Sequence, residues 1–123
     1  MTFSRIVSLA ASAVIFMLAI AGSAQDRKAA DPSMRVYLDN DHVRVQEHRL
    51  APGERVGMHS HPCYFIYVTQ DAKVRFTFPD GSSREAAAKA DSVFWHEAGS
   101  HAVENIGDTE IRNIVTELKH CES

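Results

Sequence analysis

The chain has 123 residues, of which 45% are hydrophobic and 24% are charged, and its formal net charge is −3. A chain of this length can bury one hydrophobic core, which indicates a single domain. It contains no block of lysine or arginine, so the composition gives no reason to expect a nucleic-acid partner.

The first segment, residues 1–24, has the pattern of a secretory signal peptide. Arg5 supplies a short basic region, residues 6–20 are almost wholly apolar, and Gly22 and Ala24 are the small residues before a cleavage point after Ala24. The apolar run is short for a membrane-spanning helix, which needs about 20 residues, although a retained N-terminal anchor is the alternative. Removing 24 of 123 residues would leave a periplasmic or secreted protein of 99 residues.

The rest of the chain is predicted to form a flexible leader (25–33), one domain (34–119) and a C-terminal tail (120–123). The domain consists of short runs rich in β-branched and aromatic residues, each closed by turn residues. We expect strands at residues 34–38, 43–50, 56–61, 64–69, 73–78, 93–96, 101–106 and 111–118. Many short strands at regular spacing predict an all-β sandwich or barrel.

Two short stretches add detail to this pattern. Pro52 and Gly53 suit the two central positions of a type II turn between two of the strands. Residues 85–90, with the sequence EAAAKA, have high helix propensity. An isolated helix of this length is marginal in water, so we expect the surrounding β structure to prevail.

Two histidines, His59 and His61, lie one residue apart in the strand expected at 56–61. Side chains alternate between the two faces of a strand, so both rings point to the same side and can converge on one ion. Imidazole is a common ligand of zinc, copper, iron and nickel. His101 is the candidate third ligand, because it lies 40 residues beyond His61, which allows two or three intervening strands.

These histidines and their neighbours resemble the two sequence motifs of the cupin superfamily. The first motif reads Gly53-x5-His59-x-His61-Pro62, and the second reads Gly99-x-His101-x3-Asn105. The resemblance extends over roughly residues 36–118. It implies an all-β fold, the cupin-type double-stranded β-helix, which is a small jelly-roll barrel.

The resemblance also implies a metal site inside the barrel. In the family, the histidines of both motifs bind a divalent transition metal, which here would be Fe, Zn, Mn, Ni or Cu. Carried over to this sequence, the ligands are His59, His61 and His101. The remaining motif residues would have structural roles: Gly53, Pro62, Gly99 and Asn105.

The sequence departs from the family pattern in both motifs. Most metal-binding cupins add a glutamate four or five residues after the second histidine, where this chain has Phe65 and Ile66. The second motif usually opens with a glycine, here Ala90, and usually has a proline where Glu97 stands. The resemblance therefore implies a three-histidine site, whose open coordination positions would take water, hydroxide or an anionic substrate.

The other histidines and the aromatic residues carry less specific signals. His96 could be a spare ligand or a proton shuttle, but we expect it to be partly exposed at a strand end. His48, on a polar stretch, and His42, in a turn, are expected to face solvent. Most aromatic residues are expected to pack inside the barrel: Tyr64, Phe65, Tyr67, Phe76, Phe78, Phe94 and Trp95.

The pairing of the two cysteines, Cys63 and Cys121, is open from the sequence. An exported protein can form disulfides, but sequence alone does not show whether the two residues are close enough to pair. Each could instead pair with a cysteine of another chain or stay a free thiol. Cys63 shares the strand parity of His61, so it could also face the metal, although Pro62 interrupts the strand pattern.

Three functions agree with this pattern. The favoured one is a metal-dependent enzyme of oxygenase-like type that acts on a small molecule, although no catalytic residue can be named. The second is a non-catalytic periplasmic module that binds a metal or small ligand, and the third is a cupin with a vestigial site. Similar small cupins include some tied to β-alanine or other small-molecule catabolism, a role that an export signal disfavours. The family also implies a homodimer, paired through the strand at 34–38.

Overall fold

The computed structural model describes residues 33–121. The predicted signal peptide and nearly all of the predicted leader lie outside this range. The described residues form nine strands and no helix. The strands are β1 (Met34–Asp39), β2 (Val43–Leu50), β3 (Arg55–His61), β4 (Tyr64–Val68), β5 (Ala72–Thr77), β6 (Ser83–Ala88), β7 (Val93–His96), β8 (Gly99–Asn105) and β9 (Ile111–Leu118).

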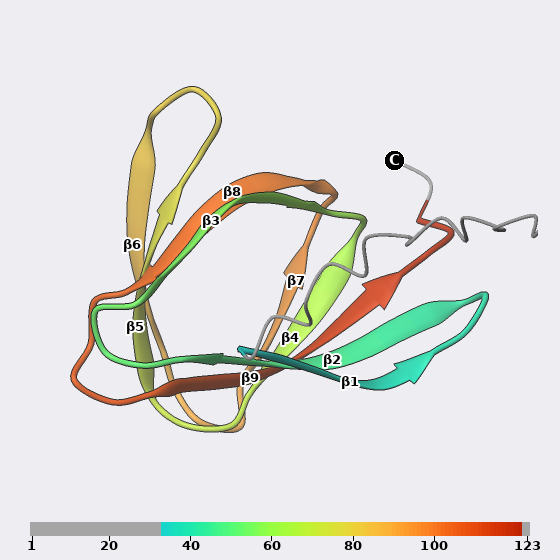
Figure 1. Cartoon of the computed structure of the whole chain (residues 1–123), viewed down its shortest axis with the longest axis horizontal. Coiled ribbons are helices and arrows are strands. Elements are labelled where there is room, and N and C mark those ends of the chain that lie inside the picture. The colour runs from blue at the N-terminus through green and yellow to red at the C-terminus, as the bar shows by residue number, and fades with distance from the viewer. Residues whose placement is uncertain (1–32, 122–123) are drawn as a thin grey trace, which may run out of the picture.

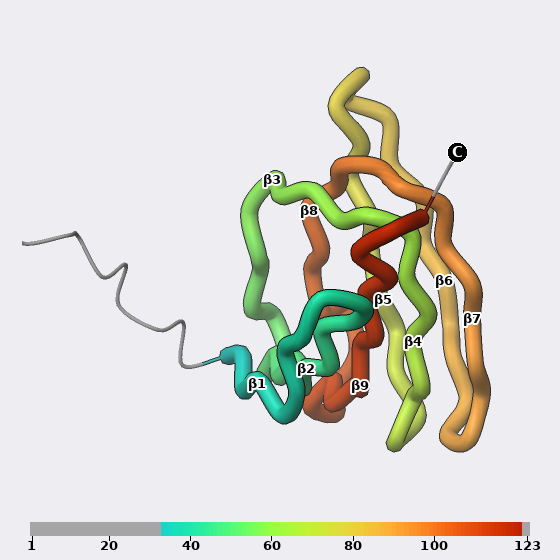
Figure 2. The backbone as a smooth tube through the Cα atoms, turned by 90° about the vertical axis from the view of Figure 1, so that its right-hand side faces the viewer, coloured from blue at the N-terminus to red at the C-terminus, as the bar shows by residue number. Residues whose placement is uncertain are grey.

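The strands form two antiparallel sheets that face each other (Figure 1). One sheet has five strands in the order β1-β2-β9-β4-β7, and the other has four in the order β3-β8-β5-β6. In Figure 2 the strands of each sheet follow one another from left to right in these orders. The crossovers between the sheets give the double-stranded jelly roll that the sequence predicted.

Local helix propensity yields to strand pairing in β6. Glu85 and Ala86–Ala88 of the EAAAKA stretch pair along β5, where Glu85 lies opposite Arg75. The Arg75 guanidinium donates to the Glu85 carboxylate at 2.8 Å, and the same guanidinium donates to Glu104 on β8 at 3.0 Å. The expectation that β structure prevails over helix is therefore confirmed, and β6 ends at Ala88, before the last two residues of the stretch.

The turn between β2 and β3 is tied to the end of β8 by one buried amide. Gly53 has a φ of 80°, as the second central residue of a type II turn requires, and its N–H donates to the Asn105 carbonyl at 2.9 Å. The Asn105 side chain donates to the carbonyls of Leu50 at 2.9 Å and Thr109 at 2.8 Å. Asn105 thus has the structural role that the resemblance implied.

The second motif shows one difference from expectation and one unusual backbone conformation. β8 begins at Gly99, two residues earlier than predicted, which places His101 inside a strand. Asp91, which follows Ala90 and precedes β7, has a left-handed backbone with a φ of 64°. The Asp91 carboxylate accepts a hydrogen bond from the Tyr67 hydroxyl at 2.5 Å, which helps to hold a conformation that usually favours glycine.

The hydrophobic core lies between β2, β5 and β9. It contains Leu50, Ala72, Val74 and Ile111. Not all aromatic residues join it, because the outer face and edge of the five-stranded sheet are open to solvent. Trp95 is 52% exposed there, and Tyr67 and Phe94 are also exposed, so the expected inward packing is wrong for these three. None of the elements described has the helical length and apolar character needed to cross a membrane.

Candidate metal centre

The three predicted ligands lie on two neighbouring strands. His59 and His61 belong to β3, His101 belongs to β8, and His59 lies directly opposite His101 in the antiparallel register. Their ring centroids are 4.7 Å apart for His59 and His61, 4.8 Å for His59 and His101, and 5.3 Å for His61 and His101. One ligand atom from each ring lies within 4.8 Å of the others, so the three rings can share one ion.

Hydrogen bonds orient two of these rings. His59 Nδ1 lies 2.8 Å from the Gly57 carbonyl oxygen, and His61 Nδ1 lies 2.5 Å from Glu117 Oε1. Both oxygens accept, so each Nδ1 carries the proton and each Nε2 keeps its lone pair for a metal. Metal-binding histidines typically have their second nitrogen held in this way. The donor set therefore fits a transition-metal ion.

The electrostatics of the third ring fit the same ion. Burial, and then the nearby His59 and His61 rings, lower the pKa of His101 to about 4. His101 is therefore neutral near pH 7 and can offer a lone pair. Three neutral imidazoles would leave the charge of a divalent ion to be balanced by other groups.

Glu117 on β9 supplies a carboxylate that the sequence analysis did not identify. It is not at the family's glutamate position, where Phe65 and Ile66 stand, but it reaches His61 across the barrel. In the sequence, Glu117 could have been noticed because strand alternation places it on the same face of β9 as the buried residues Ile111 and Val115. Only the pairing of β9 between β2 and β4 shows which ligand it meets.

Tyr64 is a second neighbour of the histidines. Its ring lies 4.6 Å from the His61 ring and is stacked on His96 at 4.8 Å. Burial, and then the charge of Glu117, raise the pKa of Tyr64 to about 12, so its hydroxyl stays protonated.

The histidines line one wall of a cavity of about 300 Å³ between the two sheets. Val56, Val74, Phe76 and Val103 make the cavity apolar on the side of the four-stranded sheet. Gln46, His48 and Asn113 line it from β2 and β9. This volume is at the lower end for ligand pockets and suits a small molecule.

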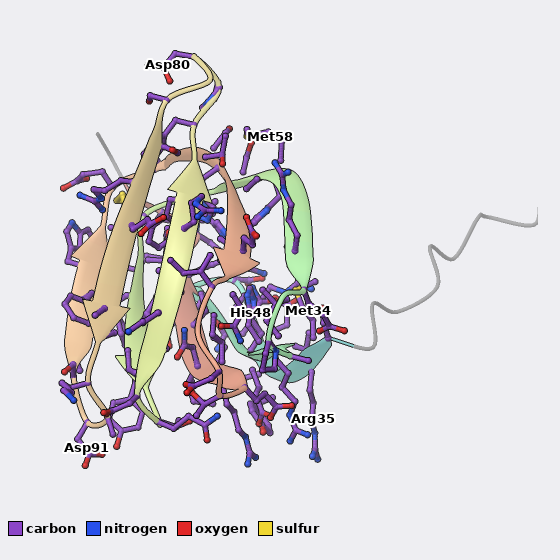
Figure 3. The ribbon with its side chains drawn as sticks, turned by 90° about the vertical axis from the view of Figure 1, so that its left-hand side faces the viewer. Met34, Arg35, His48, Met58, Asp80 and Asp91 are labelled. Carbon is purple, nitrogen blue, oxygen red and sulfur yellow. A yellow bond between two sulfur atoms is a disulfide. The ribbon has the colours of Figure 1, made fainter. Side chains whose placement is uncertain are left out.

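The exposure of the other histidines was predicted correctly for two of them and wrongly for a third. His42 is exposed and His96 lies half-buried at the end of β7, as predicted. Burial, and then the charge of Arg84, lower the pKa of His96. His48, expected to face solvent, is half-buried and lies 6.2 Å from the His61 ring. It lines the cavity between the sheets, and Figure 3 shows it beside Met34, its partner in the pairing of β1 with β2.

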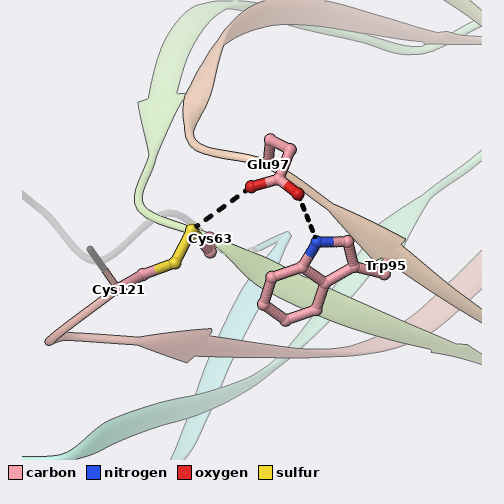
Figure 4. The surroundings of a disulfide bond; sticks show 4 residues. All are labelled: Cys63, Trp95, Glu97 and Cys121. Atoms are coloured by element: carbon pink, nitrogen blue, oxygen red, sulfur yellow. Dashed lines mark hydrogen bonds between the residues drawn. A yellow bond between two sulfur atoms is a disulfide. The ribbon is translucent and has the colours of Figure 1, made fainter. Parts of the chain in front are cut away.

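The cysteines form a disulfide, so Cys63 is not a metal ligand (Figure 4). Pro62 and Cys63 lie between β3 and β4, where the strand parity that would turn Cys63 toward the metal is broken. The bond joins this connection to Cys121, just beyond β9, with the Cα atoms 5.7 Å apart. The Leu118 N–H also donates to the Cys63 carbonyl at 2.9 Å. The end of β9, which carries Glu117, is thereby held beside the histidines.

Comparisons with known proteins agree with this architecture. No protein-family model matches the chain. It is 34% identical over 95 residues to the "Beta-alanine degradation protein BauB" of Pseudomonas aeruginosa, which covers 76% of this chain and 97% of that protein. A crystal structure of a cupin domain from Bordetella pertussis is 28% identical, with a TM-score of 0.65 over 70% of this chain and 91% of that one.

A more distant structure shows the fold alone. A cupin superfamily protein from Desulfitobacterium hafniense is 16% identical, with a TM-score of 0.55 over 69% of this chain and 74% of that one. The paired sheets, the histidine cluster and the likeness to the Pseudomonas protein along nearly its whole length point to the same family. The chain belongs to the cupin superfamily.

Proposed function

We propose that this protein is an exported cupin that holds one divalent transition metal through His59, His61 and His101 and acts on a small anionic molecule. The convergence of three ligand atoms within 4.8 Å, on the wall of a cavity, carries this proposal. When bound, such an ion would supply a Lewis acid with open coordination positions for a substrate. The metal would be Fe, Zn, Mn, Ni or Cu, since imidazole nitrogens suit all of these to some degree.

The chain's own residues would prepare the site for that role. The Gly57 carbonyl and the Glu117 carboxylate hold two rings in the orientation needed for binding. The apolar side chains of the cavity limit the number of water molecules around a bound substrate. The Tyr64 ring lies beside the His61 ring and lines the cavity, and its protonated hydroxyl would be a hydrogen-bond donor for an anionic group.

Small-molecule catabolism has support from one relative. The name of the Pseudomonas protein refers to β-alanine degradation, and that protein matches this chain along 97% of its own length. We extend the general role, chemistry on a small carboxylate, to this chain. An oxygenase-like reaction remains part of the proposal because a three-histidine site leaves several coordination positions open.

A non-catalytic binding protein is the second candidate. Glu117 is the carboxylate of the described cavity that reaches the histidines, and it is already engaged with His61. Among the residues that the structure describes, no further carboxylate lines the cavity as a general base. This arrangement favours binding over proton-transfer chemistry.

Metal analysis and oxygen consumption separate these functions. We expect the purified protein to contain close to one transition metal per chain. Turnover of oxygen with any member of a panel of thiols, diketones and phenolics would identify an oxygenase, and bound metal without turnover would favour the binding protein. A protein that stays metal-free after addition of iron, zinc and copper would contradict both and leave a vestigial site.

Export and self-association are separate parts of the proposal. Cell fractionation, with the mass of the purified protein, would test release to the periplasm or medium after cleavage at Ala24. The edge strand β1 exposes Val36, Tyr37 and Leu38, which is consistent with pairing between two copies. Sedimentation of the wild-type protein would show a dimer, and a monomer at all concentrations would contradict this pairing.

A further inference from the structure

The cavity wall opposite the histidines carries amide side chains in an otherwise apolar sheet face. Gln46 on β2 and Asn113 on β9 both line the cavity. Gln46 pairs with Val115 in the sheet, and Asn113 pairs with His48, so the two amides lie on adjacent strands two residue pairs apart. Gln46 is only 3% exposed. We call Gln46 and Asn113 the amide wall.

The carbonyl oxygens of the amide wall have unmet hydrogen-bonding capacity. Gln46 Oε1 and Asn113 Oδ1 are both buried, and neither has a hydrogen-bond partner within the described part of the chain. A buried polar atom without a partner destabilises a fold, so such atoms need a specific explanation. Both atoms belong to residues that line the same cavity, and this shared location points to a ligand.

Two fully buried polar side chains outside this cavity, Asn105 and Glu47, are well satisfied. Asn105 makes hydrogen bonds with two carbonyls and accepts one from the Gly107 N–H. The carboxylate of Glu47, the residue next to Gln46, accepts from Tyr37, Arg49 and Arg112 on the other face of the sheet. The deficit is therefore a property of the cavity wall and not of the sheet as a whole.

The chemistry of the wall defines what it can bind. Two carbonyl oxygens accept hydrogen bonds, so the bound group must donate an N–H or an O–H. Arg44 also lines the cavity from β2, and its Nε lies 4.0 Å from the Asp39 carboxylate. A positive guanidinium on this wall, together with a cation at the histidines, disfavours an ammonium group and favours a ligand with net negative charge.

We infer that the amide wall binds the hydroxyl or amide N–H of a small carboxylate whose anionic end lies at the histidines. This inference rests on the proposed metal site, because the metal would hold the anionic end. The histidines and the amide wall line the same cavity of about 300 Å³, a volume that suits a small molecule.

Ligand binding to the cobalt-loaded protein tests this inference. The cobalt absorption spectrum changes when a carboxylate reaches the metal. The comparison uses 3-hydroxypropionate, propionate and β-alanine, which share one carbon chain and differ only in the group at its far end. We expect wild type to bind 3-hydroxypropionate about tenfold more tightly than propionate, because its hydroxyl donates one hydrogen bond to a carbonyl oxygen of the amide wall that otherwise has none. β-Alanine should bind more weakly than 3-hydroxypropionate, and tighter binding of β-alanine would overturn the choice of a neutral donor.

Variants then assign the preference to the wall. Gln46→Met and Asn113→Leu keep side-chain volume but remove the acceptors, so the preference should fall toward onefold while cobalt affinity stays within about twofold. Gln70→Met, which changes a glutamine whose amide donates to the Glu110 carbonyl outside the cavity, should keep the full preference. If one cavity variant does not fold, the other still tests the wall.

The outcomes separate the inference from the proposed function. Failure of wild type to bind cobalt contradicts the metal site itself. Cobalt binding without a preference for 3-hydroxypropionate, or a preference that survives both cavity substitutions, overturns the amide wall alone. A higher melting temperature of the ligand-free Gln46→Met protein would further support the inference, because the variant removes an unsatisfied buried group. A lower melting temperature in the folded variant would mean that Gln46 is satisfied without a ligand, against the inference.

Discussion

The polar groups on the two walls of the cavity differ in whether they have hydrogen-bond partners. On β3, the second nitrogens of His59 and His61 are hydrogen-bonded, to Gly57 and Glu117. On β2 and β9, the oxygens of Gln46 and Asn113 lack partners among the described residues. Satisfied groups orient a site before its ligand arrives, whereas unsatisfied groups gain their partner from the ligand. The difference indicates that the histidines are oriented before a metal binds, whereas the amide wall opposite them is completed by a ligand.

The largest effect is expected from the ligands themselves. His59→Ala or His101→Ala removes one of three nitrogens, so metal content should fall from close to one ion per chain to near zero. His42→Ala, in an exposed turn, is the matched control and should leave the content unchanged. Elemental analysis of the three purified variants makes this measurement, and full occupancy in His101→Ala would remove His101 from the site.

Loss of the disulfide should have the next largest effect. The Cys63–Cys121 bond closes a separation of 58 residues, and cross-links of this kind stabilise a fold by about 2–5 kcal/mol. Urea unfolding of the double variant Cys63→Ser/Cys121→Ser should show that loss relative to wild type. Dithiothreitol should destabilise wild type but not the variant, and equal midpoints for all samples would contradict a structural role for the bond.

Removal of the contact between Glu117 and His61 should weaken metal binding without abolishing it. Glu117→Leu leaves His61 Nδ1 without its acceptor, and loss of such a partner typically weakens metal binding about 10–100-fold. Glu117→Gln can still accept the hydrogen bond and should lose less. Competition with a chelator measures both affinities, and Glu110→Leu in the exposed loop before β9 is the control. Wild-type affinity in Glu117→Leu would show that the ring needs no such support.

Acid titration tests a satisfied group on the outer face of β2, and should give the smallest effect. The Tyr37 hydroxyl, and then Arg49 and Arg112, lower the pKa of Glu47 from 4.5 to about 2. A lowered pKa stabilises the fold above the ordinary value, and this stability is lost as pH falls from about 4.5 toward 2. Thermal melts of Glu47→Gln should therefore depend less on pH in that range than those of wild type. Identical pH profiles would mean that the carboxylate is not ionised in this network.

Much of the fold could be predicted because its signals are local. The strand β2 was predicted with its observed bounds, and the type II turn at Gly53 followed from a Pro-Gly pair. The common direction of His59 and His61 followed from strand alternation alone. The facing direction of β2 could not be predicted, because both faces of its sequence VRVQEHRL carry polar residues. That ambiguity is why His48 was assigned to solvent.

The sequence by itself determined the all-β architecture and the common face of His59 and His61, because strand alternation acts over short stretches of chain, and the resemblance to the cupin motifs added His101 as the third partner. Only the tertiary structure decided that Glu117 meets His61, that Cys63 pairs with Cys121, and that Gln46 and Asn113 face the cavity. Each of these contacts joins residues that are distant along the chain or on faces that alternation leaves undecided. Such contacts depend on strand order and on which sheet covers which face, and these are properties of the whole barrel.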